Sequence, residues 1–165
     1  MIDPLPLSAD ASRRRDRYAT VRETVSALLE DQTDWIAAMA TVACELHHAF
    51  EYYDWTGFYR VVSADLLLVG PYQGEHGCIA ISFSRGVCGA AARTRRTQLV
   101  ADVGAVADHI ACSSTTRSEV VVPVLTPAGK LLAVLDVDSD SPAAFGEVDV
   151  RALEAICDEL GRRFG

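Results

Sequence analysis

Hydrophobic side chains at both ends of the chain recur with the spacing of an α-helix. Between residues 12 and 31 they return every three or four positions, which predicts an amphipathic helix. The same spacing predicts a second helix over residues 35–50, where Thr33 or Asp34 can cap the first turn. A last helix is predicted over about 146–163, again with one apolar stripe. The chain is therefore expected to begin and end in helices.

Between these helices the pattern changes to short alternating or continuous apolar runs, which are typical of strands. Residues 54–62 and 65–70 are separated only by a short turn and predict a hairpin. Residues 119–139 predict a second hairpin, because Pro127 and Gly129 interrupt two apolar runs. The shorter predicted elements are strands at 78–82 and 97–103, a helix at 85–94 and turns over 70–77. Because hairpins dominate this order, we expect an α+β fold around a mainly antiparallel sheet.

The length and composition fit one globular domain. The chain has 165 residues and half of them are hydrophobic, which is enough to form a sizeable core. Residues 1–11 are acidic, contain two prolines and lack an apolar stretch, so we expect a flexible N-terminal tail. Residues 12–165 show no internal repeat and no linker, and are predicted to form a single domain.

The net charge limits the partners that the protein can have. The formal charge is −8 at pH 7, which argues against binding to nucleic acid or to an anionic membrane. The one basic run, residues 13–15, is followed at once by Asp16 and fits the solvated start of a helix. No segment has the length of a transmembrane helix and no signal-peptide core is present, so we expect a cytoplasmic protein.

The five cysteines fall into two groups by their sequence surroundings. Cys44 and Cys157 lie on apolar helix faces and are expected to be core residues. Cys78 begins a predicted strand, Cys88 stands at the start of a helix, and Cys112 lies in the polar stretch DHIACSSTTRSE. Because the chain carries no export signal, structural disulfides are not expected, and catalytic roles are favoured for the second group.

Two of these thiols have basic neighbours that would favour the reactive thiolate. The helix start and Arg85 would lower the pKa of Cys88. His109 and Arg117 would lower the pKa of Cys112 if the loop folds them inward. A metal site is less favoured, because no C-x2-C pair exists and the spacings within this group are ten and twenty-four residues. We therefore predict thiol redox chemistry and no metal.

Three carboxylates are predicted to meet at one corner of the sheet. Asp136 and Asp138 are two residues apart at the end of a strand, so both point to the same face. Glu119 begins the preceding strand, and pairing of the two strands as a hairpin brings it to the same end. Such a cluster requires a cation, for example a substrate ammonium group, or a proton retained on one acid. Trp55, at the start of an early strand, is either a core residue or the wall of an apolar pocket.

Seven segments, in their order along the chain, resemble the free methionine-(R)-sulfoxide reductases, which are single-domain GAF proteins. The segments are DWTGFY, GPYQG, GCIAI, RGVCGAA, HIAC, SEVVVPV and GKLLAVLDVDS, and the similarity extends over roughly residues 20–162. The three cysteines together with VLDVDS are the most specific part, since binding-only GAF domains usually lack this set. The resemblance implies a central sheet of about six strands, with the terminal helices on one face and the ligand pocket under loops on the other.

The resemblance also implies a reaction and a role for each candidate residue. The substrate would be free L-methionine (R)-sulfoxide, and its reduction would leave a cysteine sulfenic acid and then an intramolecular disulfide. Cys112 would be the nucleophile, and Cys78 or Cys88 would be the resolving thiol. Glu119 or Asp138 would supply the proton. The residues that would bind the substrate are Trp55, Ala111, Glu119, Asp136 and Asp138.

The same resemblance implies no bound cofactor, with thioredoxin as the external reductant, and it favours a homodimer formed through the terminal helices. Two other functions fit the residues. One is a non-catalytic GAF module that binds a small ligand, and the other is a thiol redox sensor without a substrate. The sequence departs from the family where ISFSRGVCG lacks a proline and a glycine expected before RGVCG, and in the arginine run, Cys44 and Cys157. None of these departures involves a group with a proposed chemical role.

Overall fold

The computed structural model describes residues 3–106 and 114–165, which fold around one six-stranded sheet. The helices are α1 (Ala11–Leu28), α2 (Trp35–Ala49), α3 (Gly86–Thr94) and α4 (Glu147–Phe164), with a short 3-10 helix, η1 (Val103–Ala105). The strands are β1 (Trp55–Ser63), β2 (Leu66–Gln73), β3 (Ala80–Ser82), β4 (Gln98–Val100), β5 (Ser118–Leu125) and β6 (Leu131–Ser139). Every pairing is antiparallel, in the order β3-β2-β1-β6-β5-β4, which confirms the predicted α+β class.

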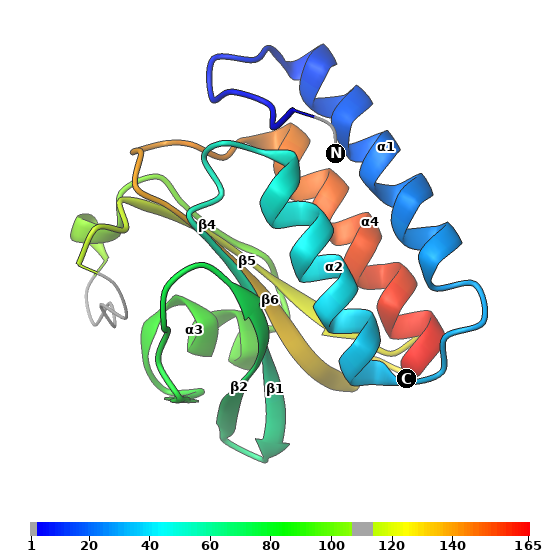
Figure 1. Ribbon diagram of the computed structural model, residues 1–165. Coiled ribbons are helices and arrows are strands. Elements are labelled where there is room, and N and C mark those ends of the chain that lie inside the picture. The colour runs from blue at the N-terminus through cyan, green and yellow to red at the C-terminus, as the bar shows by residue number, and fades with distance from the viewer. Residues whose placement is uncertain (1–2, 107–113) are drawn as a thin grey trace.

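The elements are stacked in layers, as Figure 1 shows. Helices α2 and α4 pack on one face of the sheet, α2 against β1 and β2 and α4 against β5. Helix α1 lies outside them and contacts both, while α3 packs on the opposite face against β5 and β6. The expectation that the terminal helices share one face of the sheet is therefore confirmed.

Alternation along the central strands divides the hydrophobic residues between two clusters. Val120 on β5 and Leu135 on β6 point toward the helices and join the larger core. Val121 and Val134 point the other way, into a smaller cluster that α3 completes with residues such as Ala91. Strands that are apolar on both faces are typical of a sheet covered on both sides, and the smaller cluster is the face that carries the candidate site.

Local signals set the ends of several elements as predicted. The Asp34 side chain accepts a hydrogen bond of 2.8 Å from the Ala37 N–H and caps α2. Between β5 and β6, Gly129 adopts a φ of 79°, a left-handed conformation that glycine tolerates best. Other boundaries differ from the prediction, since β2 continues to Gln73 through part of the predicted turn over 70–77. Helix α1 ends at Leu28 instead of residue 31, and the strand predicted over 97–103 is shortened to Gln98–Val100. None of the described helices combines the length and the apolar character needed to cross a bilayer.

The described part of the N-terminal segment, from residue 3 onward, is attached to the helical layer, whereas a flexible tail was predicted over residues 1–11. Leu5 is buried and forms a strand-like bridge with Phe50. The Leu5 N–H donates to the Ala49 carbonyl over 2.9 Å, and its carbonyl accepts from the Glu51 N–H over 3.0 Å. The composition of the segment suggested disorder, but one apolar side chain and two backbone hydrogen bonds attach it to the end of α2.

Candidate active site

The register of the central strands gathers three acidic side chains on the sheet face opposite α2 and α4. Glu119 on β5 pairs directly with Asp138 on β6, and Asp136 lies two residues before Asp138. Since side chains alternate along a strand, all three point to the same face. The structure therefore brings these acids together as the predicted hairpin requires.

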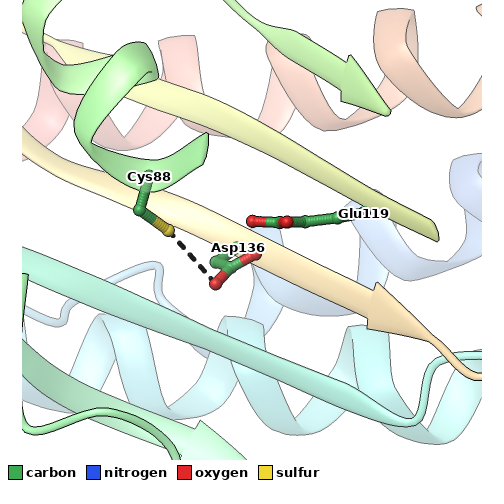
Figure 2. Close-up of side chains that lie close together, drawn as sticks. All are labelled: Cys88, Glu119 and Asp136. Atoms are coloured by element: carbon green, nitrogen blue, oxygen red, sulfur yellow. Dashed lines mark hydrogen bonds between the residues drawn. The ribbon is translucent and has the colours of Figure 1, made fainter. Parts of the chain in front are cut away.

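Helix α3 places a thiol beside this acid cluster, as Figure 2 shows. The Cys88 thiol donates a hydrogen bond to Asp136 Oδ2 over 3.2 Å. The Cys88 sulfur and one carboxylate oxygen each from Glu119 and Asp136 lie within 4.8 Å of one another, and all three residues are buried. Gly89 lets α3 approach the preceding segment, because a Cβ there would lie 2.5 Å from the Ser82 carbonyl oxygen.

The acids are in an environment that disfavours their charged forms. Burial, and then the charge of Glu119, raises the pKa of Asp136 well above its ordinary value. Burial also raises the pKa of Asp138, with further contributions from Asp136, Asp140 and Asp54. Within residues 3–106 and 114–165, no lysine or arginine forms a salt bridge with Asp136 or Asp138. In this surrounding, Asp136 and Asp138 favour a proton or a cationic ligand such as an ammonium group.

The prediction that the pKa of Cys88 is lowered is wrong. Cys88 is only 3% exposed, and burial, followed by the charges of Asp136 and Glu119, raises the pKa of its thiol well above the ordinary value. The expectation rested on the helix N-terminus and on Arg85. Loss of hydration and two neighbouring acids outweigh the partial charge of a helix end.

The other cysteines differ in their position and, where they are described, in their oxidation state. Cys78 is disulfide-bonded and lies two residues before β3 instead of opening the strand. Cys112 and Ala111, the predicted nucleophile and a predicted substrate contact, lie outside the described residues. Cys157 is buried in the helical layer, as expected for a core residue, and Cys44 is half-buried. The cysteines that the structure records as free are Cys44, Cys88 and Cys157.

Trp55 forms an aromatic wall next to the acids. It is the β1 partner of Asp138, and its indole is 7% exposed. The ring stacks between Tyr59 and Tyr72, with centroid separations of 5.6 and 5.3 Å. The indole N–H donates to the Glu75 carbonyl over 3.0 Å, which fixes the ring orientation. Trp55 is thus a buried member of the smaller core cluster that lies beside the acids, and its role as a pocket wall stays a prediction.

Tyr59 is a member of this site that the sequence reasoning missed. It lies on the same face of β1 as Trp55, four residues later, and this even spacing was the available signal. Burial, and then Asp136, raises the pKa of Tyr59, so its hydroxyl remains a hydrogen-bond donor. Gly77 packs against both rings, since a Cβ there would lie 3.0 Å from Tyr59 Oη and 3.1 Å from Trp55 Cζ2.

These groups could accept a small molecule that carries both a positive charge and an apolar end. The acids suit the charge, and the stacked indole suits the apolar end. Cys88, Glu119 and Asp136 also have ligand types that bind metals. However, the Cys88 thiol keeps its proton and donates a hydrogen bond to Asp136, whereas a metal ligand would be a thiolate.

Comparisons with known proteins agree with this geometry. The family model of the GAF domain matches residues 19–163. An X-ray structure of free methionine-R-sulfoxide reductase from Neisseria meningitidis in complex with its substrate is 41% identical, with a TM-score of 0.83. The match covers 99% of this chain and 96% of that one.

Two curated relatives carry the same name. The free methionine-R-sulfoxide reductase of Saccharomyces cerevisiae is 37% identical over 135 residues, covering 78% of this chain and 75% of the yeast protein. That of Escherichia coli is 32% identical over 143 residues, covering 87% and 86%. The similarity thus extends over most of this chain and most of each relative.

Proposed function

This chain belongs to the GAF domain family and, within it, to the free methionine-R-sulfoxide reductases, and from this premise we propose that it reduces free L-methionine (R)-sulfoxide to methionine with its own thiols. The observation that carries the proposal is the acid cluster beside a stacked tryptophan. A free amino acid with a methyl sulfoxide side chain offers both the ammonium group and the apolar methyl group that such a site would bind.

Binding of the substrate would relieve the electrostatic cost of the acid cluster. Asp136 and Asp138 have raised pKa values because loss of hydration and neighbouring acids disfavour their charged forms. A substrate ammonium between them would supply the missing positive charge. A residue within a polypeptide has no free ammonium group, so this interaction favours the free amino acid. The Trp55 ring would contact the methyl group at the other end of the substrate.

The chemical step would transfer the sulfoxide oxygen to an enzyme sulfur. The Cys112 thiolate attacks the sulfoxide sulfur while a protonated carboxyl, Glu119 or Asp138, delivers a proton to the oxygen. The oxygen then passes to Cys112, which becomes a sulfenic acid, and methionine leaves. In balance, one sulfoxide and one thiol give one thioether and one sulfenic acid.

The resolving step would use a second thiol of the enzyme. Its thiol condenses with the Cys112 sulfenic acid, which forms a disulfide and releases water. Cys78 and Cys88 are the two candidates. The disulfide-bonded state of Cys78 supports Cys78 for this step, and the burial of Cys88 and its raised pKa count against Cys88.

Return to the reduced enzyme would require an external dithiol, and we assign this step to thioredoxin in the cytoplasm. Exchange with the thioredoxin dithiol opens the enzyme disulfide and oxidises thioredoxin. No bound cofactor is needed in this scheme, because both electrons come from thiols. The terminal helices α1 and α4 are the surfaces through which a homodimer would form.

An assay that separates the two sulfoxide epimers tests the proposed function. The reduced protein is mixed with thioredoxin, thioredoxin reductase and NADPH, and then with free L-methionine (R)-sulfoxide, the S epimer or a sulfoxide-containing peptide. We expect NADPH oxidation, mole for mole, with the R epimer alone. Cys112→Ser should abolish turnover.

The same assay distinguishes the alternatives. A non-catalytic ligand-binding module would consume no NADPH with any sulfoxide. A redox sensor would consume NADPH only in proportion to its own disulfide, whatever sulfoxide is added. Either result would refute the proposed reductase.

A further inference from the structure

Cys78 lies where one edge of the sheet meets solvent. It is half-buried and disulfide-bonded, and it comes two residues before β3, the last strand of the sheet on that side. The next residue, Ile79, is 75% exposed, the highest exposure among the large hydrophobic side chains that the structure describes. None of the steps proposed above uses Ile79 or this edge of the sheet.

We infer that residues 78–80, here called the β3 edge, are the docking surface of the dithiol protein that reduces the enzyme, and that a thiolate of this reductant attacks the sulfur of Cys78. The inference rests on the proposed function and deepens it, because it assigns the surface and the sulfur at which reduction of the enzyme begins.

The backbone of the β3 edge can pair with an extended segment of a partner. The Val69 N–H donates to the Ile79 carbonyl over 2.9 Å, and Leu68 is the β2 partner of Ala80. Backbone groups of successive residues in a strand point to opposite sides, so those of Ala80 point away from β2. In the sheet formed by the described residues, β3 has no neighbouring strand on that side. An open strand edge binds other chains by backbone pairing.

The side chains of the β3 edge suit a protein partner. Ile79 and Ala80 are both exposed, and neither carries a charge. A single exposed apolar side chain is ordinary on a protein surface, but this one directly follows the sulfur that a reductant must reach. Covering Ile79 would remove apolar area from water and would hold the partner next to Cys78.

Attack on Cys78 also releases the sulfur that the next catalytic cycle needs. In the proposed scheme Cys78 is bonded to Cys112, and Cys112 must ionise readily because it is the nucleophile. Disulfide exchange is faster when the sulfur that leaves belongs to the thiol with the lower pKa. Attack on Cys78 therefore releases Cys112 as the thiolate that attacks the next substrate.

Reduction is complete after two displacements. In the first, the reductant thiolate forms a bond to the Cys78 sulfur, the enzyme disulfide breaks, and Cys112 leaves with the electron pair. In the second, the other thiol of the reductant loses its proton and attacks the reductant sulfur of the mixed disulfide. This releases Cys78 as a thiolate, which takes up a proton. The reductant ends as a disulfide and the enzyme regains two thiols.

Trapping the mixed disulfide tests which sulfur is attacked. The protein is oxidised with diamide, so that the test does not depend on turnover, and is mixed with thioredoxin whose second active-site cysteine is replaced by serine. Mass spectrometry of the peptides then identifies the cysteine that is bound to thioredoxin. We expect Cys78, and a mixed disulfide at Cys112 would overturn the inference.

Two variants of the exposed side chain test the docking surface. Ile79→Asp places a charge on the β3 edge, and we expect kcat/KM for thioredoxin to fall roughly tenfold or more, as loss of one buried isoleucine contact implies. Ile79→Val should stay within about threefold of the wild type. With dithiothreitol as the reductant, which needs no docking surface, both variants should reduce the R epimer as fast as the wild type.

Ile36→Asp is the matched control, because Ile36 is 45% exposed and lies on α2, on the other face of the sheet. It should leave kcat/KM for thioredoxin unchanged. An Ile79→Asp protein with unchanged kcat/KM for thioredoxin would overturn the inference. So would an Ile79→Asp protein that changes from dimer to monomer in light scattering, because the β3 edge would then be a subunit interface. Failure of the proposed function is recognised separately, since the wild-type protein would then form no methionine with either reductant.

Discussion

Buried carboxyl groups make the free energy of unfolding of this protein depend on pH. Asp138 holds its proton to a higher pH in the folded state than in the unfolded chain, because burial and three neighbouring aspartates raise its pKa. The folded state therefore binds more protons than the unfolded state between the ordinary pKa of about 3.8 and the raised one. In that window the free energy of unfolding falls as the pH rises.

Replacing Asp138 by asparagine should consequently stabilise the protein. We expect the free energy of unfolding of Asp138→Asn to exceed that of the wild type at pH 7 by at least about 1 kcal/mol, the equivalent of roughly one pKa unit. The difference should shrink toward zero well below pH 3.8, where both states of the wild type are protonated. Urea denaturation at several pH values measures it. Asp158→Asn, at an exposed position on α4, is the control and should change little. A destabilised Asp138→Asn at pH 7 would contradict this account of the cluster.

If Glu119 is the proton donor, replacing it should slow the chemical step. Glu119→Gln keeps the shape of the side chain but cannot deliver a proton. We expect kcat to fall about 100-fold or more, with a much smaller change in KM. Steady-state kinetics with the R epimer measures both, and Glu51→Gln on the helical side is a matched control. If Glu119→Gln keeps kcat within threefold, another acid is the proton donor.

At the scale of elements, Gly57 in the β1–β2 hairpin leaves room for the Trp55 ring. A Cβ at Gly57 would collide with the Tyr72 Cβ and lie 2.6 Å from Trp55 Cη2. The strand partner and the indole together leave no space for a side chain at this position. The absence of a side chain at position 57 is therefore part of how Trp55 is oriented.

Gly57→Ala should accordingly damage both folding and substrate binding. We expect a loss of about 1–3 kcal/mol in the free energy of unfolding, the usual cost of overpacking, and a raised KM. Thermal denaturation and steady-state kinetics measure the two effects. Gly146→Ala is the comparison, since the nearest atom to its Cβ would be 4.0 Å away. A Gly57→Ala protein with normal stability would mean that the hairpin adjusts around the new methyl group.

The elements also explain which parts of the site could be predicted from the sequence. The alternation within VLDVDS and the turn at Gly129 were sufficient to place Glu119, Asp136 and Asp138 together, because hairpin register follows from local pattern. The position of Cys88 over Asp136 was not predictable. It depends on how α3 crosses the sheet, which is a tertiary contact without a periodic signal.

At the scale of the whole molecule, the sheet separates the candidate site from a polar network that holds the helices together. Asp149 on α4 is 1% exposed and pairs with Arg14 on α1 over 2.8 Å. It also accepts hydrogen bonds from the Tyr18 hydroxyl and the Gly146 N–H, each over 2.8 Å. Arg14 in turn donates to the Leu7 carbonyl over 2.8 Å, which attaches the N-terminal segment.

Asp149→Asn should lower the stability of the protein and leave its activity unchanged. We expect a loss of about 3 kcal/mol, because the partly buried Arg14 would keep its charge without its partner and the Tyr18 hydroxyl would lose a charged acceptor. The melting temperature should drop by roughly 5–10 °C. KM and kcat of the remaining folded protein should be unchanged at 20 °C, since the network and the site lie on opposite faces of the sheet. Combined with Asp138→Asn, the two stability changes should add, as expected for distant sites.

This whole-molecule arrangement accounts for two predictions that failed. The composition of the N-terminal segment predicted a flexible tail, but Leu5 and Arg14 attach its described part to α2 and to the network. The lowered pKa of Cys88 was argued from its own helix, whereas the acids that raise its pKa come from β5 and β6. In both cases the deciding partner is distant in sequence, so local patterns carried no information about it.

A single-turnover experiment tests the central claim most directly. Fully reduced protein is mixed with an excess of free L-methionine (R)-sulfoxide in the absence of thioredoxin, and the methionine formed and the state of every cysteine are measured by mass spectrometry. We predict one methionine per protein molecule, a disulfide between Cys78 and Cys112, and a Cys88 thiol that remains reduced. Formation of no methionine, or of a disulfide that contains Cys88, would contradict the account.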